Sequence, residues 1–383
     1  MTQEPDTPLE EEERIAWLTL ALTPGITLPR LKKLIETCLT PSGALAAPLA
    51  LLETVPELKA NVAASVHAAK MDLGYRVMDD LIRVGGQLLL PGDPGFPPLL
   101  RSVEPAPTHL FALGRLELLE RPAVAIVGSR DHTRYGAEVC EAIAGGAAAA
   151  GIVVVSGMAR GLDAIAHHSA LAASGGSIGV LGCGLGVIYP ESNRRLYSLM
   201  SRDGLLLTEA PPGERPKKGS FPKRNRIIAG LARATVVVEA AVGSGALITA
   251  NEALDQGKDV LAVPGGVTSP TSVGTNGLLR DGAAPLLDLD DLLSRYPEVK
   301  QATEAADPDA STPPGAVIVM LKSGPRQADE IAATLRFPTG QVLALLGVME
   351  IQGLVIQRPG LTYSLARARF AAHPIQRVSD SAI

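Results

Sequence analysis

The chain has 383 residues, of which 46% are hydrophobic and 20% charged, with a formal net charge of −5 and a sequence pI near 5.8. This composition excludes a disordered or strongly basic protein, and the length is typical of two or three domains. Because salt confines electrostatic effects to about 8–10 Å, a mildly acidic chain can still carry a local basic site for nucleic acid.

The cysteines and the hydropathy pattern favour a soluble protein of the reducing cytosol. Cys38, Cys140 and Cys183 are odd in number and form no C-x-x-C pair, which argues against disulfides and against a zinc site. The first residues are acidic, unlike a signal peptide, and no run reaches the roughly 20 apolar residues of a membrane span. We therefore expect a cytoplasmic protein with no membrane span and no bound metal.

Residues 1–85 predict a small domain of short helices. Gly25 ends one apolar stretch and Pro29 begins the next, so that the two form a helical hairpin. Such a hairpin can offer backbone N–H groups to phosphate, and the basic side chains of its second helix would then be auxiliary DNA contacts. We favour a simple packing module, because the turn contains a single glycine.

Residues 86–298 predict an extended Rossmann-like domain, which begins with a Pro-rich connector as far as Pro122. After it, short apolar runs rich in Val and Ile alternate with Ala-rich helical stretches. Such runs are typical of strands buried on both faces, with the helices as crossovers, so the fold class is α/β with a doubly wound, mostly parallel sheet. The predicted strands lie in residues 123–128, 151–157, 177–184, 204–210, 234–240 and 259–265.

The C-terminal part predicts a linker and a winged helix. Residues 299–313 are polar, contain Pro and lack periodicity, as linkers do. Residues 314–383 hold two helical stretches and two apolar strands about a Pro-Gly turn, followed by a tail. The presumed recognition helix, residues 339–353, has no Lys or Arg and one Glu, so we do not expect it to contact phosphate.

Small and polar residues follow the predicted strands, where parallel sheets bind their ligands. Gly128, Ser129 and Arg130 follow the first run, and Ser156 and Gly157 follow the second. Each glycine alone is explained by a tight turn, but several such turns beside an arginine favour a phosphate-bearing ligand. The dinucleotide fingerprint and the Walker motif are both absent, so no nucleotide cofactor is expected.

Other residues raise the question of an enzyme. His167 and the histidine after it point apart on a helix, so they cannot share a metal, and we favour a surface or capping role. The G-x-S-x-G match at residues 175–179 leads into a strand, whereas a nucleophile elbow follows one. Glu209 and Glu239 each end a predicted strand and could form an acid–base pair. They could equally accept N–H bonds or pair with Arg226, and we favour this structural role.

Residues 214–226 gather positive charge around one aromatic ring. Six of them are Lys or Arg, against one Glu, and the whole chain has only five Phe. This pattern suits single-stranded nucleic acid, because cations follow the phosphates and a ring stacks a base for about 1–3 kcal/mol. A solvated basic loop with its ring in the core explains the stretch equally well. The candidate residues are Lys217, Lys218, Phe221, Lys223, Arg224, Asn225 and Arg226.

Six motifs stand in order over residues 124–283 and together resemble the DNA-processing protein A family (DprA, also called Smf). They read VAIVGSR, SGMARGLDAIAH, GVLGCGLGVIYP, FPKRNRIIAG, VVVEA with SGALITA, and VPGG with GTNGLLRDGA. The resemblance implies an extended Rossmann domain, an N-terminal helical domain of the SAM or helix-hairpin-helix kind, and a C-terminal winged helix.

The same resemblance implies a function. Members of the family are non-catalytic recombination mediators of natural transformation, which bind and protect incoming single-stranded DNA and load the RecA recombinase onto it. The implied partners are therefore single-stranded DNA, RecA, single-strand-binding protein and a second copy of the chain in a homodimer.

The family's functional residues can be carried over by position. Arg130 would grip a phosphate, Lys218 would be a second cation, and Phe221 would contact a base. Further positions would supply backbone donors or line the pocket, namely Gly128, Ser129, Gly157, Arg224, Asn225 and Arg226.

The rival interpretation is a nucleotide phosphoribohydrolase similar to the lysine-decarboxylase-like enzymes. Their motif, P-G-G-x-G-T-x-x-E, includes a catalytic Glu. Residues 264–272 read PGGVTSPTS, which lacks both the Gly-Thr pair and the Glu. We therefore expect a binding protein without enzymatic activity.

Overall fold

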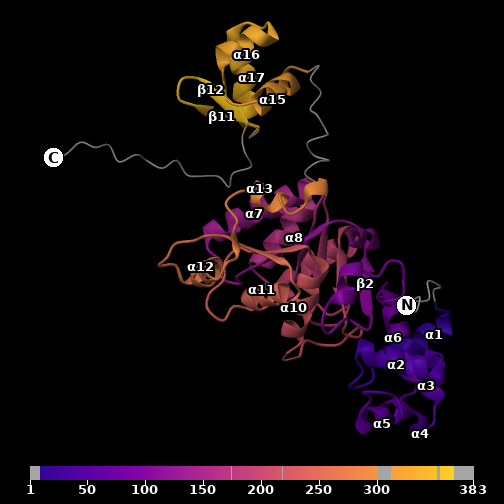
Figure 1. Ribbon diagram of the computed structural model, residues 1–383. Coiled ribbons are helices and arrows are strands. Elements are labelled where there is room, and N and C mark those ends of the chain that lie inside the picture. Colours follow the sequence, from indigo (N-terminus) through magenta and orange to yellow (C-terminus); the bar gives the residue numbers. More distant parts are fainter. Residues whose placement is uncertain (1–8, 174, 218, 300–311, 352–353, 366–383) are drawn as a thin grey trace. The chain divides into compact units, whose positions relative to one another are not determined.

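The computed structural model describes residues 9–173, 175–217, 219–299, 312–351 and 354–365. The chain divides into two compact units, one up to Leu286 and the other from Leu287 onward (Figure 1). The boundaries predicted from the sequence, at residues 85 and 298, differ from this division and stay a prediction.

A nine-stranded sheet forms the centre of the first unit. Its middle strands are the six predicted runs: β3 (Ala123–Val127), β4 (Val153–Ser156), β5 (Ser177–Val180), β6 (Leu205–Thr208), β7 (Ala234–Val237) and β8 (Asp259–Ala262). All six pair in parallel, in the spatial order β6-β5-β4-β3-β7-β8. The order reverses at β3 and β7, as it does in doubly wound sheets. The predicted α/β fold class is confirmed.

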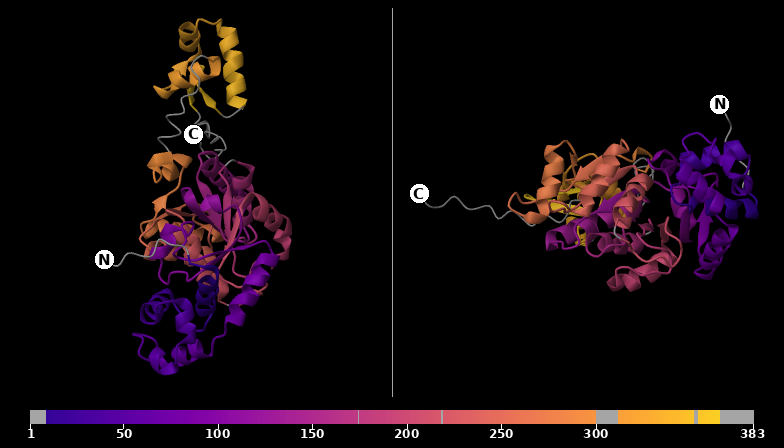
Figure 2. Two further views of the ribbon diagram at one scale, coloured as in Figure 1. Left: turned by 90° about the vertical axis from the view of Figure 1, so that its right-hand side faces the viewer. Right: turned by 90° about the horizontal axis from the view of Figure 1, so that it is seen from below.

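Helices cover both faces of this sheet (Figures 1 and 2). One face carries α7 (Arg134–Ala149), α8 (Leu162–Ala172) and α9 (Arg194–Asp203), and the other carries α10 (Ser220–Leu231) and α11 (Gly245–Asp255). Successive strand side chains point to opposite faces. Val127 and Val155 therefore pack with Ile227 of α10, whereas Leu206 packs with Met200 of α9. The same cores hold the loops at the strand ends in place.

The Pro-rich stretch contributes more than a connector. It contains β1 (Gln87–Leu89) and β2 (Leu110–Gly114), which extend the sheet by antiparallel pairing of β1 with β2 and of β2 with β6. All of its Pro residues except Pro122 lie in the loop between these strands, which includes the short helix η1 (Pro98–Ser102). The interpretation as a mere connector was wrong, because apolar runs this short carry little periodicity. At the opposite edge, α12 (Val273–Arg280) leads to β9 (Ala284–Pro285), which pairs with β8.

Among the residues described from position 9 onward, six helices precede the sheet, and Gly25, at φ 86°, separates the first two as predicted. They are α1 (Glu11–Ala21), α2 (Leu28–Cys38), α3 (Pro41–Ala46), α4 (Leu49–Leu52), α5 (Ala60–Ala68) and α6 (Met71–Arg83). Leu18 and Leu81 share a hydrophobic core with Phe111 of β2. Arg14 donates to both oxygens of Asp93, at 2.5 and 2.9 Å. The helices are therefore packed onto the edge of the sheet.

The second unit has the predicted winged-helix pattern. Its elements are α13 (Leu289–Leu293), α15 (Pro313–Lys322), β10 (Arg326–Gln327), α16 (Ala328–Leu335), α17 (Thr339–Ile351), β11 (Val355–Arg358) and β12 (Thr362–Leu365). The three strands form one antiparallel sheet, with β12 in the middle. Val317, Ile331, Leu346 and Tyr363 form its core. No single helix of the described residues is long and apolar enough to cross a membrane; α16 and α17 reach that composition only as a pair bent by 113°.

Candidate nucleic-acid interface

A pocket of about 240 Å³ lies at the carboxyl ends of β3, β4 and β5, the position at which parallel sheets bind ligands. The loops after these three strands form most of its wall, and the beginning of α10 closes it. The lining residues are Arg130, Gly157, Met158, Ala159, Arg160, Leu181, Gly182, Cys183, Tyr189, Pro190, Phe221 and Arg224. Arg130 and Phe221, which lie 91 positions apart in the sequence, thus face one cavity.

The lining of this pocket is cationic, with three arginines and no carboxylate. Arg130 is exposed and makes no hydrogen bond or ion pair with any residue that the structure describes. Arg160 is also exposed and pairs with Asp131 at 3.0 Å. Two positive charges therefore stand at the mouth of the pocket, one of them without a counterion in the described chain.

A second pocket of about 360 Å³ adjoins the first and shares Leu181, Gly182 and Arg224 with it. Lys217 and Lys223 line this second pocket, together with two carboxylates. Lys223 is exposed, and Lys217 pairs with Glu214 at 3.0 Å. Lys218 lies outside the described residues. We call the two pockets together the cationic groove. It runs along the carboxyl ends of the parallel strands.

Phe221 lines the first pocket, with its ring against the backbone of Gly182, which both pockets share. A Cβ atom at position 182 would come within 2.6 Å of the ring's Cδ1, so only glycine leaves room for the ring there. The ring of Tyr189 also lines the first pocket, with its centroid 5.4 Å from that of Phe221. The aromatic character of the site therefore comes from two rings.

Arg224 forms the floor between the two pockets. Its Nη1 donates to the carbonyl oxygen of Gly157 at 2.6 Å and to that of Val180. Burial lowers the pKa of Arg224 to about 10, opposed by the nearby Asp163 carboxylate and assisted by repulsion from Arg130. The side chain is therefore still charged at neutral pH. A Cβ atom at position 157 would come within 2.6 Å of this guanidinium, which explains the glycine.

A buried network fixes the loop after β4. Asp163 accepts the backbone N–H groups of Gly157 at 3.1 Å and Ala159 at 3.3 Å. Burial raises the pKa of Asp163, against the effect of Arg224. His167 accepts the N–H of Met158 at 3.3 Å and bonds Ser177 at 2.7 Å. This loop is therefore held by side chains from α8 and β5.

The two histidines have different environments. Burial lowers the pKa of His167 to about 3, so the ring is neutral near pH 7 and acts as a fixed acceptor. The following residue, His168, is exposed. The sequence interpretation of both as surface or capping residues is wrong for His167, which is fully buried beneath the pocket.

Several predicted site residues support the pocket rather than face it. Gly157 does line the first pocket, but Asp163 already accepts its N–H. The Ser129 hydroxyl bonds the backbone of Asp131. Ser156 is buried and donates to Ile126. Three further predicted residues do not line the first pocket, namely Gly128, Asn225 and Arg226. Of these, Asn225 is buried and donates to Gly245, and Gly128 packs beside Leu162.

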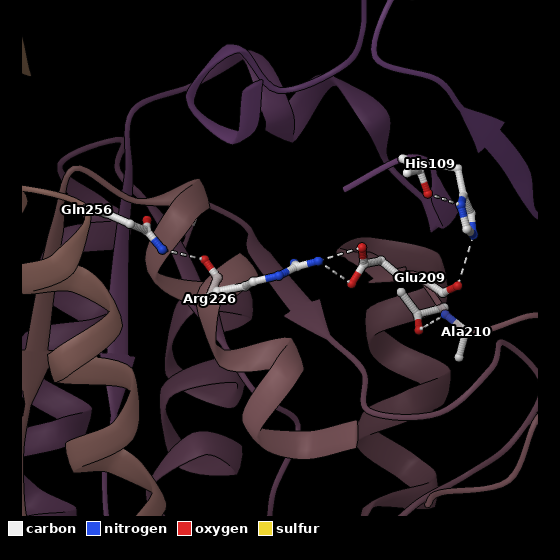
Figure 3. A network of polar contacts seen from close by, with 7 residues as sticks. His109, Glu209, Ala210, Arg226 and Gln256 are labelled. Atoms are coloured by element: carbon white, nitrogen blue, oxygen red, sulfur yellow. Dashed lines mark hydrogen bonds and ion pairs between the residues drawn. The ribbon is translucent and has the colours of Figure 1, made fainter. Parts of the chain in front are cut away.

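Arg226 belongs to a polar network with Glu209, a residue that lines the second pocket (Figure 3). Its Nη2 donates to both oxygens of Glu209, at 2.7 and 2.9 Å, and Gln256 donates to its carbonyl oxygen at 3.0 Å. His109 bonds the Glu209 carbonyl oxygen at 3.0 Å. The structural role favoured for Glu209 is confirmed, because its carboxylate is paired with the arginine expected.

Glu239 occupies the place where the strand order reverses, between β3 and β7. It is 2% exposed. Its carboxylate accepts the N–H and the hydroxyl of Thr133, at 2.9 and 2.6 Å, and the hydroxyl of Thr271 at 3.2 Å. A Cβ atom at Gly136 would come within 2.3 Å of it. An internal carboxylate therefore fills the position at the start of α7 that could otherwise hold a nucleotide phosphate.

Sequence reasoning missed Arg160 and Tyr189. Arg160 stands in the loop after a predicted strand, so its position was a usable signal. Tyr189 lies nine positions beyond β5, and nothing in the local pattern places it beside Phe221. Among the described residues, no three His, Cys, Asp or Glu side chains gather in a way that could hold a metal ion.

The fold and the site define a class: a Rossmann-like α/β protein with a winged-helix unit and a cationic, aromatic-lined pocket at its strand ends. The sequence model described as DNA recombination-mediator protein A matches residues 87–297, and that of the DprA winged helix domain matches residues 301–360. The chain therefore belongs to the DNA recombination-mediator protein A family, also called DprA or Smf.

Curated relatives agree with this assignment. Protein Smf of Synechocystis sp. is 34% identical over 328 residues, covering 76% of this chain and 82% of the relative. The DNA processing protein DprA of Streptococcus pneumoniae is 43% identical over 204 residues, covering 53% of this chain and 72% of the relative.

Solved structures agree as well. The crystal structure of DNA processing protein A from Streptococcus pneumoniae aligns with a TM-score of 0.63 at 33% identity, over 75% of this chain and 98% of that one. The DNA processing protein A of Helicobacter pylori, solved to describe its single-stranded DNA binding mode, gives a TM-score of 0.51 at 30% identity, over 56% of this chain and 96% of that one.

Proposed function

We propose that the protein binds single-stranded DNA in the cationic groove. The observation that carries this proposal is that Arg130 and Phe221 line one pocket, together with Arg160 and without a carboxylate. Guanidinium groups hold phosphates, and an aromatic ring stacks a base without reading its edge. The Helicobacter pylori relative, whose structure concerns single-stranded DNA binding, supports the same ligand class.

The proposed footprint consists of the exposed cations and the ring. Arg130 and Arg160 bind phosphate in the first pocket, and Lys217 and Lys223 do so in the second, with Lys218 as a further cation. Arg224 and Asp163 keep the loops in position. Because contacts of this kind read no base edges, the binding is largely independent of sequence.

We further propose that binding serves recombination. The protein protects incoming single strands during natural transformation and loads RecA onto them, also where single-strand-binding protein is present, and it acts as a cytoplasmic homodimer. Support comes from the family description, which names a recombination mediator. A strand-exchange assay tests this step: the protein should raise the RecA rate on DNA already covered by single-strand-binding protein, and no increase would contradict it.

The proposed activity is binding without catalysis. The motif glutamate of the phosphoribohydrolases is missing from residues 264–272. Glu239, a strand-end carboxylate that could have served instead, is buried and bonded to Thr133 and Thr271. Its carboxylate therefore has a structural role. We expect no free base to be released from nucleoside monophosphates. Release of free base by the wild type, abolished in Glu239→Gln, would instead support the phosphoribohydrolase interpretation.

A gel-shift series tests the ligand class directly. Oligo-dT and a duplex of equal length are titrated with the full chain at two salt concentrations. We expect the single strand to bind more tightly than the duplex, and both complexes to weaken at higher salt, because bound cations release counterions. Equal affinity for the duplex, or no binding of the single strand at low salt, would contradict the proposal.

A further inference from the structure

We propose that Tyr189 is the ring on which a base of the bound single strand stacks, with Phe221 as the support behind it. This inference rests on the proposed function, and it changes the role assigned to Phe221 from the sequence. Four observations carry it: the exposure of the two rings, their separation, the fixed loop of Tyr189 and the charges beside it.

The two rings differ in exposure. Tyr189 is 47% exposed, whereas Phe221 is partly buried against the backbone of Gly182. A base can stack only on a ring face that solvent already reaches. Tyr189 therefore offers the larger free surface, and Phe221 packs between it and the strand ends.

The separation of the rings excludes a base between them. Their centroids lie 5.4 Å apart and their planes are tilted by 35°. For a base to be sandwiched, the two ring centroids must lie about 7 Å apart, which is twice the roughly 3.4 Å repeat of stacked bases. At the observed distance Tyr189 and Phe221 pack directly on each other. The base must therefore stack on the outer side of the pair, which Tyr189 presents.

The loop that carries Tyr189 is held in place without a ligand. Asn193 donates to the carbonyl oxygens of Met158 at 3.0 Å and Ala159 at 3.1 Å, which ties the loop to the pocket wall. Gly186 donates to the hydroxyl of Tyr197 at 2.8 Å. Because the ring is fixed beforehand, little conformational entropy is lost when a base stacks on it.

The surroundings of Tyr189 suit a nucleotide. Arg130 and Arg160 line the same pocket, so phosphates flanking the stacked base meet positive charge. The Tyr189 hydroxyl makes no hydrogen bond within the described part of the chain. The hydroxyl is therefore not needed to hold the ring in position, so phenylalanine should keep the stacking face.

The experiment measures the affinity of the full chain for oligo-dT by fluorescence anisotropy. Tyr189→Ala should weaken binding about tenfold, the size expected for one lost base–aromatic stack. Tyr189→Phe should restore the affinity. Tyr75→Ala removes a comparably exposed tyrosine, 45% exposed, from α6 and is the matched control. Circular dichroism establishes that each variant is folded.

An abasic oligonucleotide separates stacking from other effects. It keeps the phosphates and lacks the bases, so wild type and Tyr189→Ala should bind it equally. Three results would overturn the inference: full affinity of Tyr189→Ala for oligo-dT, an equal loss on the abasic strand, or failure of Tyr189→Phe to restore binding. If the wild-type chain binds no oligo-dT at all, the proposed function itself fails instead.

Discussion

Arg130 and Arg224 line the same pocket, but their surroundings give them opposite tasks. Arg130 is exposed and unpaired within the described chain, so its charge is available to a ligand. Arg224 is buried and holds the carbonyl oxygens of Gly157 and Val180. Turning this side chain toward a phosphate would break its two bonds to the loop that it supports.

Replacing each arginine should separate the two roles. Arg224→Met leaves the buried Asp163 carboxylate without its compensating charge, which costs about 3–5 kcal/mol of unfolding free energy. Arg130→Ala removes only exposed atoms and should leave stability unchanged while weakening DNA binding. Thermal unfolding measures the stability of both variants, and fluorescence anisotropy with oligo-dT measures their DNA binding. An unfolding temperature of Arg224→Met equal to that of wild type would contradict the structural role.

The exposed pair of Asp131 and Arg160 restrains a pocket cation in the free protein. Asp131→Asn should strengthen binding of oligo-dT by up to about fivefold, because an exposed ion pair is worth about 0.2–1 kcal/mol. Glu138→Gln breaks the comparable surface pair with Arg134, at 2.7 Å, outside the pocket, and should have no effect. Unchanged or weaker binding by Asp131→Asn would contradict the proposal that this pair competes with DNA for Arg160.

At the scale of elements, α10 links the groove to the core. Its first turn brings Phe221 and Lys223 to the pockets, and the side chains from Arg224 to Leu231 are buried. At its other end Lys258 donates to the carbonyl oxygens of Ala229 at 2.9 Å and Gly230 at 2.7 Å. The position of the pocket ring therefore depends on contacts at the far end of the same helix.

This contact gives a pH-dependent prediction. Burial lowers the pKa of Lys258 to about 8, below the unfolded value of about 10.4. Between these values the unfolded chain binds more protons, so the Lys258 contribution to stability rises with pH and is lost as pH falls through about 8. Thermal unfolding of wild type and Lys258→Met should therefore diverge in favour of wild type from about pH 8 to about pH 10. A difference independent of pH would contradict the account.

The elements were largely predictable from the sequence, because β3 to β8 are buried on both faces and read as continuous apolar runs. β1 and β2 were not, because they are short and separated by Pro-rich loops. In the site, Arg130 was placed correctly at a strand end. Which arginines of α10 face inward was not visible, because this depends on carbonyl and carboxylate partners from distant segments.

The position of Tyr189 could not be predicted from the sequence either. Its position beside Phe221 is set by the bonds of Asn193 to the loop after β4, and no local pattern encodes a contact over that distance. Glu239 is a further case. The sequence left acid–base and structural roles open, and only the contacts with Thr133 and Thr271 decide between them.

At the scale of the whole molecule, the cations that we propose bind DNA lie in the first unit. In the second unit α17 carries no Lys or Arg, and Arg336 and Arg358 are scattered on either side of it. We predict that Arg336→Ala and Arg358→Ala together change the affinity for oligo-dT less than twofold. A loss as large as that of Arg130→Ala, measured by anisotropy, would show that the winged-helix unit contributes phosphate contacts.

The central claim is that Arg130 and its neighbours hold the phosphates of a single strand, and salt dependence tests it most directly. If five phosphates are neutralised, log K for oligo-dT should fall with log salt at a slope of about −3.5, and Arg130→Ala should flatten the slope by about 0.7. Arg83→Ala, which removes an exposed arginine of α6, serves as the control. A wild-type slope near zero, or an identical slope and affinity in Arg130→Ala, would contradict the account.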